Sequence, residues 1–328
     1  MHARQGFGTR LIVSAVLAGL GALAVAASGA QMSSSPDGSH APATYATRRE
    51  PSPAGRIVVV TANVQEAFGA DDLKSMSELG VLVPRMLKQV PFRPDVVLLQ
   101  DARKKAVDRI AQLLEKKTGD RYRVGQRLRR EPWEKRPHKV WYSTETAILV
   151  NSATMKLEAG DFVRIYNPWG NPKKSYKEYK GQAYASATER DGDAEVGLMS
   201  VHLPKAPKNN AKTRKKYGPW VERLAAFMDR KYDGVTKVIG GDFNQTRCRS
   251  KDPCKVTPFW SSLSSADPGY TEALWHVQEQ KHWSKRLPLG VDWIFTTDGI
   301  ENADGDVKNP PKFYSNHRFF WGDLEVAP

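Results

Sequence analysis

Short apolar runs, each bounded by turn-forming residues, constrain the fold of this chain more than any other feature. They occupy residues 57–60, 96–99, 147–150, 238–239 and 291–295. Runs of this length are typical of buried β-strands. Two further runs, 183–188 and 196–202, are separated by Asp191-Gly192-Asp193. They predict a hairpin, because an Asp-Gly step supplies the positive φ that a tight turn needs.

Two stretches between these runs have the periodicity of amphipathic helices. Each places its apolar residues on a single face, and these residues are Ala106, Ile110, Leu113 and Leu114 in one stretch and Trp220, Leu224, Phe227 and Met228 in the other. Strands in runs and hairpins with only a few helices favour packed sheets with helices outside, rather than a strictly alternating parallel sheet. We therefore expect an α/β protein with its helices on the outer faces of the sheets.

The N-terminus has the pattern of a secretory signal. Arg4 and Arg10 lead into an apolar run at 11–27, which ends at Ser28-Gly29-Ala30. We predict a signal peptide at 1–30, cleaved after Ala30, and hence a secreted, extracellular protein without stable membrane insertion. An uncleaved anchor is the alternative, because the run is at the lower limit for spanning a bilayer. Residues 31–55 are rich in Ser, Pro and Ala and predict a flexible linker, and 56–328 predict one domain, expected to be a monomer.

The charge balance points to an acidic partner. Lys and Arg number 50 against 36 Asp and Glu, a net charge of +14, while 40% hydrophobic residues exclude a fully disordered chain. Basic clusters lie at 121–139, 173–180, 205–216 and 281–286, with interleaved aromatic residues able to stack on bases or sugars: Trp133, Trp141, Tyr176, Tyr179, Tyr217 and Trp283. We favour contact with the phosphate backbone of DNA or RNA. A solvated basic surface and phospholipid headgroups remain as alternatives.

Polar residues of catalytic type follow the predicted strands one after another. They are Asn63, Asp101, His202, Asp242, Asn244, Asp292 and His317. Taken singly, an Asp or Asn after a strand usually caps a turn. The ordered set favours metal-assisted acid/base chemistry, because a strand end aims side chains into a cleft.

The sequence blocks around these residues resemble a known superfamily. The blocks are Thr61-Ala62-Asn63, residues 94–101, residues 200–203, Gly241-Asp242-Phe243-Asn244, residues 291–295 and residues 315–318. In this order they are similar to the endonuclease/exonuclease/phosphatase superfamily, which includes secreted deoxyribonuclease-I-like, metal-dependent phosphodiesterases. The resemblance implies a four-layer α/β/β/α sandwich of two mixed sheets flanked by helices.

The resemblance also implies a role for each residue. Asp101 stands where a glutamate ligates the divalent cation, Asn63 supports the metal and phosphate, and Asn316 stands where an aspartate precedes the last histidine. His202 would contact phosphate or act as an acid, Asp242 and Asn244 would orient the attacking water, and Asp292 would orient His317. The implied cofactor is Mg²⁺, with Mn²⁺ or Ca²⁺ as alternatives, since Mg²⁺ prefers oxygen ligands.

Two departures from the superfamily pattern affect the expected metal site. Asp101 is one methylene shorter than glutamate, and Asn316 lacks the charge of aspartate, so both should weaken metal affinity. Cys248 and Cys254 are expected to form a disulfide, the default in an exported chain, and Arg103 and Arg247 are expected to bind substrate.

The sequence thus predicts a secreted, Mg²⁺-dependent phosphodiester hydrolase acting on DNA or RNA, a nuclease of low sequence specificity. The alternatives are a phosphatase or phospholipid phosphodiesterase on the same fold, and a catalytically impaired protein that binds nucleic acid or a surface.

Overall fold

The structure, a computed structural model, describes only part of the chain. The described residues are 50–64, 73–126, 133–136, 140–143, 145–158, 160–167, 177–205, 216–246, 257–273, 291–305, 317 and 319–327. They belong to one compact unit, Ala46–Pro328. Among them, no helix is long and apolar enough to cross a membrane. The predicted signal peptide, Cys248 and Cys254 lie outside the described residues.

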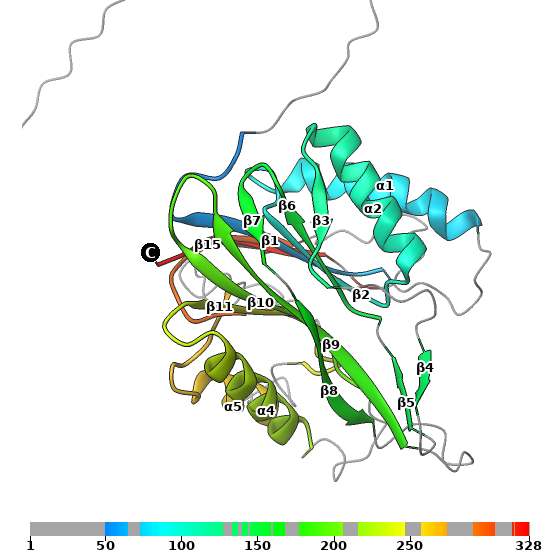
Figure 1. The fold of residues 1–328 in the computed structure, drawn as a ribbon, viewed down its shortest axis with the longest axis vertical. Helices are drawn as coiled ribbons and strands as arrows, with labels where there is room; N and C mark the ends of the chain where they lie inside the picture. The colour runs from blue at the N-terminus through cyan, green and yellow to red at the C-terminus, as the bar shows by residue number, and fades with distance from the viewer. Residues whose placement is uncertain are drawn as a thin grey trace, which may run out of the picture. The chain divides into compact units, whose positions relative to one another are not determined.

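The first sheet has six strands in the order β14-β15-β1-β2-β6-β3 (Figure 1). Their bounds are β1 Arg56–Asn63, β2 Val96–Gln100, β3 Tyr122–Val124, β6 Ala147–Asn151, β14 Ile300–Gly305 and β15 Phe320–Glu325. β1 and β2 are parallel, and the other pairs are antiparallel. The strands predicted at 57–60, 96–99 and 147–150 are confirmed.

The second sheet has nine strands, with the path β12-β13-β11-β10-β9-β5-β4 and with β7 and β8 paired to β9. Their bounds are β4 Trp133–Arg136, β5 Val140–Ser143, β7 Met155–Leu157, β8 Asp161–Asn167, β9 Lys177–Glu189, β10 Glu195–His202, β11 Thr236–Asp242, β12 Thr271–Glu272 and β13 Asp292–Thr296. β10 is parallel to β11. β9 and β10 form the predicted hairpin, with Thr188 opposite Glu195.

Two pairs of helices cover the outer faces of the sheets (Figure 1). α1 (Leu73–Gln89) and α2 (Lys104–Thr118) pack on the first sheet, and α4 (Tyr217–Lys231) and α5 (Pro258–Ser264) pack on the second. The side chains of β1 show why its sequence is continuously apolar. Ile57 and Val59 lie in the core between the sheets, whereas Val58 and Val60 lie in the core under α1 and α2. The four-layer α/β/β/α sandwich implied by the resemblance is therefore confirmed.

Buried polar side chains connect the two sheets below the strand ends. The Gln100 amide donates to Ser200 Oγ (3.0 Å), and the Ser200 hydroxyl donates to the Leu99 carbonyl (2.9 Å). These bonds satisfy groups that would be costly to bury alone. They also fix the end of β2 against β10.

Residues 50–55, at the end of the predicted linker, contact the domain. The Arg93 N–H donates to the Glu50 carbonyl (3.1 Å), and the Ser52 hydroxyl donates to Asp95. Contacts with the domain thus begin a few residues before β1.

Candidate active site

The candidate site forms where two pairs of parallel strands end. Carboxyl ends of parallel strands lie at one edge of a sheet, so β1 and β2 bring Asn63 and Gln100 side by side, and β10 and β11 do the same for His202 and Asp242. Asp292, at the start of antiparallel β13, lies opposite Asp242. Residues far apart in the sequence therefore meet at one place.

Asp242 lies at the centre of this group and is buried. Its Oδ2 accepts a hydrogen bond from the Asn63 amide (3.0 Å), and its Oδ1 accepts one from the Asn244 backbone N–H (2.7 Å). The same Oδ2 is 3.6 Å from His202 Nε2 and 3.9 Å from His317 Nε2. One carboxylate thus faces both imidazoles.

The backbone around Asp242 explains the local sequence. Gly241 has φ 146°, and a Cβ there would lie 2.0 Å from the Val201 carbonyl oxygen, so no other residue fits without a shift. Asn244 and Asp101 have φ 51° and 49°, left-handed values that Asn and Asp tolerate better than most residues. Strained positions of this kind cluster at functional sites.

Asp292 holds His317 by a short contact. Its Oδ2 is 2.8 Å from His317 Nδ1, which leaves Nε2 on the side of Asp242. Burial alone would lower the pKa of His317, but the hydrogen bond to Asp292 and the charges of Asp292 and Asp242 outweigh it and raise the pKa to about 9. The pKa of Asp292 is also raised, in this case by burial. The pair therefore retains a proton at neutral pH.

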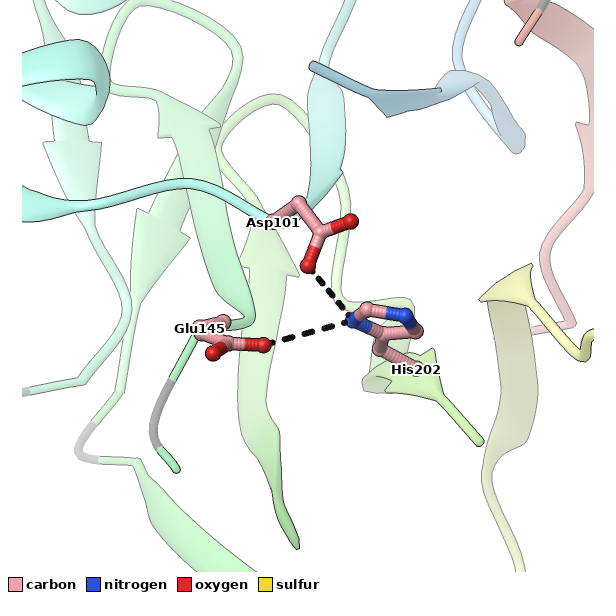
Figure 2. Close-up of side chains that lie close together, drawn as sticks. All are labelled: Asp101, Glu145 and His202. Atoms are coloured by element: carbon pink, nitrogen blue, oxygen red, sulfur yellow. Dashed lines mark ion pairs between the residues drawn. The ribbon is translucent and has the colours of Figure 1, made fainter. Parts of the chain in front are cut away.

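Sequence reasoning missed Glu145, which faces His202 Nδ1, whereas Asp242 faces His202 Nε2. Figure 2 shows its carboxylate and that of Asp101 directed at the same imidazole nitrogen. His202 Nδ1 is 3.1 Å from Asp101 Oδ1 and 3.6 Å from Glu145 Oε2. Burial alone would raise the pKa of Asp101, but the charges of His202 and Lys180 lower it below its ordinary value. Asp101 is therefore ionised at neutral pH.

Lys180 is a second residue that the site analysis of the sequence did not single out. It stands at the end of the basic cluster 173–180, on β9, and its Nζ lies 3.2 Å from His202 Nε2 and 3.9 Å from Glu145 Oε2. The His202 backbone is fixed next to it, because its N–H donates to Gln182 Oε1 (2.6 Å). The site thus contains an ammonium group with little exposure to solvent.

The remaining predicted residues fall in different places. Arg103 is the N-cap residue of α2, two positions after Asp101, and is partly exposed. Asn316 and Arg247 lie outside the described residues. The prediction that Tyr217 stacks on bases is wrong: it is fully buried against Trp220, and its hydroxyl donates to the Pro204 carbonyl. Its apolar ring fills the core under α4 because it lies on the helix face that packs against the sheet.

Solved structures with the same arrangement of sheets identify the fold. An endonuclease/exonuclease/phosphatase from Bacteroides vulgatus matches with a TM-score of 0.58 at 11% identity, over 83% of this chain and 99% of that chain. The chain has the endonuclease/exonuclease/phosphatase fold. SmcL matches with a TM-score of 0.54 at 14% identity, over 83% of this chain and 99% of that chain. The catalytic domain of human Nocturnin, solved with a bound sulfate anion, matches with a TM-score of 0.53 at 13% identity, over 83% of this chain and 95% of that chain.

Comparisons of the sequence add no closer relative. No family model matches the chain, and no curated protein sequence matches it. Enzymes with the endonuclease/exonuclease/phosphatase fold hydrolyse phosphodiester or phosphate ester bonds and depend on divalent metals.

The donor groups of this site fit such a metal. Two sets have ligand atoms within 4.8 Å of one another: Asp101 with Glu145 and His202, and Asp242 with Asp292 and His317. Four buried or half-buried carboxylates thus face two imidazoles and one ammonium group. A divalent cation would offset the excess of negative charge, and carboxylate oxygens are ligands that Mg²⁺ accepts. The arrangement combines groups for metal binding, proton transfer and phosphate binding in one place.

Proposed function

We propose that this protein is an exported, Mg²⁺-dependent phosphodiester hydrolase, and specifically a nuclease of low sequence specificity. The observation that carries the proposal is the Asp242 carboxylate, which faces His202 and His317 from a strand end of an endonuclease/exonuclease/phosphatase fold. Each imidazole has its own carboxylate partner behind it, namely Asp101 for His202 and Asp292 for His317. This arrangement suits acid/base catalysis on a phosphoryl group.

Each residue has a distinct task in this proposal. Asp242, held by Asn63 and Asn244, accepts a hydrogen bond from the attacking water and orients it. His317 keeps a proton on Nε2 and donates a hydrogen bond through it to a phosphate oxygen, because Asp292 fixes the opposite nitrogen. Lys180 offsets the negative charge of the phosphate. Bound Mg²⁺ would polarise the phosphoryl group, with the Asp101 carboxylate among its ligands.

Charge supports a nucleic acid as the substrate. The chain has a net charge of +14, and a polyanion with regularly spaced phosphates would use the basic clusters that a small phosphoester leaves unused. The sulfate in human Nocturnin is a tetrahedral oxyanion like phosphate, which fits the same chemistry. The signal-like N-terminus supports export.

The test is hydrolysis by purified protein of plasmid DNA, RNA, a phospholipid diester and a phosphomonoester, each with Mg²⁺ or with chelator. We expect Mg²⁺-dependent cleavage of nucleic acid. Asp242→Ala, His202→Ala and His317→Ala should each lower turnover by about 10²-fold or more, whereas Asp161→Ala, at an exposed carboxylate on β8, should not.

Binding to nucleic acid gives a second measurement. Affinity should fall by about 10³-fold between 50 and 200 mM salt if roughly six phosphates are contacted. A flat salt profile with cleavage of the phospholipid or the monoester would replace the nuclease proposal by one of the alternative hydrolases. Binding without hydrolysis of any substrate would favour an impaired binding protein.

A further inference from the structure

Asp101 is poorly placed to hold a cation by itself. Its side chain is one methylene shorter than glutamate, which sets the carboxylate back by about 1.5 Å. Its Oδ1 is already 3.1 Å from His202 Nδ1. One oxygen of Asp101 is therefore engaged with an imidazole, and a single carboxylate gives a divalent ion little charge compensation.

Glu145, just before β6, brings a longer carboxylate to the same point. The Glu145 carbonyl accepts the Ala102 N–H (2.9 Å), which fixes its backbone beside Asp101. β6 starts two residues later and pairs antiparallel with β2, so that Ala147 lies opposite Leu99. The carboxylates of Glu145 and Asp101 approach the same imidazole nitrogen of His202 from different segments, as Figure 2 shows.

The charges around Glu145 leave room for a cation. The side chain of Glu145 is only 7% exposed, and the nitrogens that face it, His202 Nδ1 at 3.6 Å and Lys180 Nζ at 3.9 Å, both lie beyond the length of a direct hydrogen bond. The ligand atoms of Asp101, Glu145 and His202 lie within 4.8 Å of one another. The carboxylates of Asp101 and Glu145, the first partly exposed and the second buried, repel each other at this distance unless a cation or a proton lies between them, and a divalent ion would offset both charges.

We propose that Glu145 is a ligand of the divalent cation, and that Asp101 and Glu145 together replace the single longer carboxylate expected at position 101. The proposal rests on the proposed function, whose metal this is. The competing role for Glu145 is to orient His202 through the 3.6 Å contact with Nδ1. The two roles differ in metal affinity measured without substrate.

The experiment is a double-mutant cycle on metal affinity. The Kd is measured on chelator-treated protein by calorimetry with Mg²⁺ and by electron paramagnetic resonance with Mn²⁺. The proteins are wild type, Glu145→Gln, Asp101→Glu and the double variant. Glu145→Gln should raise the Kd for the ion by about tenfold or more in the wild-type background. In the Asp101→Glu background it should raise the Kd by less than about threefold, because the longer side chain then reaches the ion alone.

Controls separate a local effect from loss of the fold. Glu158→Gln removes an exposed carboxylate that pairs with Lys156 and should leave the Kd unchanged. Thermal unfolding followed by circular dichroism shows whether each variant is folded. If Glu145→Gln does not fold, Glu145→Asp keeps the charge but shortens the reach, and its Kd should lie above that of wild type.

Two results would overturn the proposal. One is a wild-type Kd in Glu145→Gln together with reduced turnover, which would make Glu145 a positioning residue for His202. The other is an equal loss of affinity in both backgrounds, which would show that the contribution of Glu145 does not depend on the side-chain length of residue 101. If no phosphodiester is cleaved but the cycle gives the expected Kd values, the proposed function fails and the ligand assignment stands.

Discussion

The proton held by Asp292 and His317 should be visible as a pH dependence of stability in the metal-free protein. The pKa of His317 is raised from its ordinary value of 6.5 to about 9. Since the folded pKa of His317 lies above the unfolded one, its protonated imidazole stabilises the fold in full below about pH 6.5, and this contribution is lost as the pH rises through 9. The difference in pKa corresponds to at most about 3 kcal/mol of unfolding free energy.

Asp292→Asn is the perturbation that tests this. The amide keeps the shape of the side chain but removes its charge. The effect of burial on His317 is then no longer offset by the Asp292 carboxylate, so the pKa of His317 should fall by about one unit or more. The assay is an NMR titration of the histidine Hε1 signals in EDTA, with His317→Gln to assign the resonance among the seven histidines. Urea unfolding at pH 6 and pH 10 gives the stability of the same proteins.

Wild type should lose more unfolding free energy than Asp292→Asn between these two pH values, because only the wild type has the charged pair to lose. A wild-type titration midpoint near 6.5, or equal pH dependence in both proteins, would refute the reasoning. It would mean that the carboxylate of Asp292 does not hold a proton on His317.

Three further predictions follow from the strained backbone, the metal site and the cysteines. Gly241→Ala should lower the unfolding free energy by about 2 kcal/mol or more, measured in urea, because its φ of 146° and the carbonyl 2.0 Å from a Cβ exclude a side chain. Gly234→Ala is the control, since its φ is 73° but no atom lies within 4 Å, and it should cost less. Asn316→Asp should lower the Mg²⁺ concentration for half-maximal activity by about severalfold, because it adds a negative charge near a divalent ion; loss of activity instead would make Asn316 a phosphate donor. The two cysteines should not react with a thiol reagent without reductant, and stoichiometric labelling would contradict the predicted disulfide.

The local sequence was sufficient to place several of the candidate residues at strand ends. Asn63, His202 and Asp242 each follow a short apolar run, and a buried strand ends where the chain meets a polar residue. Parallel neighbours in a sheet then bring such ends together whatever the sequence between them. The hairpin of β9 and β10 was predictable for a similar reason, since the Asp-Gly step acts within a few residues.

Helix α1 shows a case in which the local sequence pattern does not predict the structure. It contains Pro84, a residue that normally ends or kinks a helix. The helix forms nevertheless, since Leu82, Val83 and Met86 are buried against the first sheet. Tertiary burial outweighs a local breaker, and this burial is not visible in the sequence.

Glu145 and Lys180 depend entirely on the tertiary structure. Glu145 precedes a strand, and it meets His202 only because β6 pairs with β2 and the two sheets stack. Lys180 belongs to a basic run for which the sequence predicted contact with phosphate or with solvent, yet the pairing of β9 with β10 places its Nζ next to His202. Strand order and register are set by packing between distant segments, so the sequence determined which residues could do chemistry at each strand end. Only the packed sheets determined which carboxylate and which ammonium group complete the site.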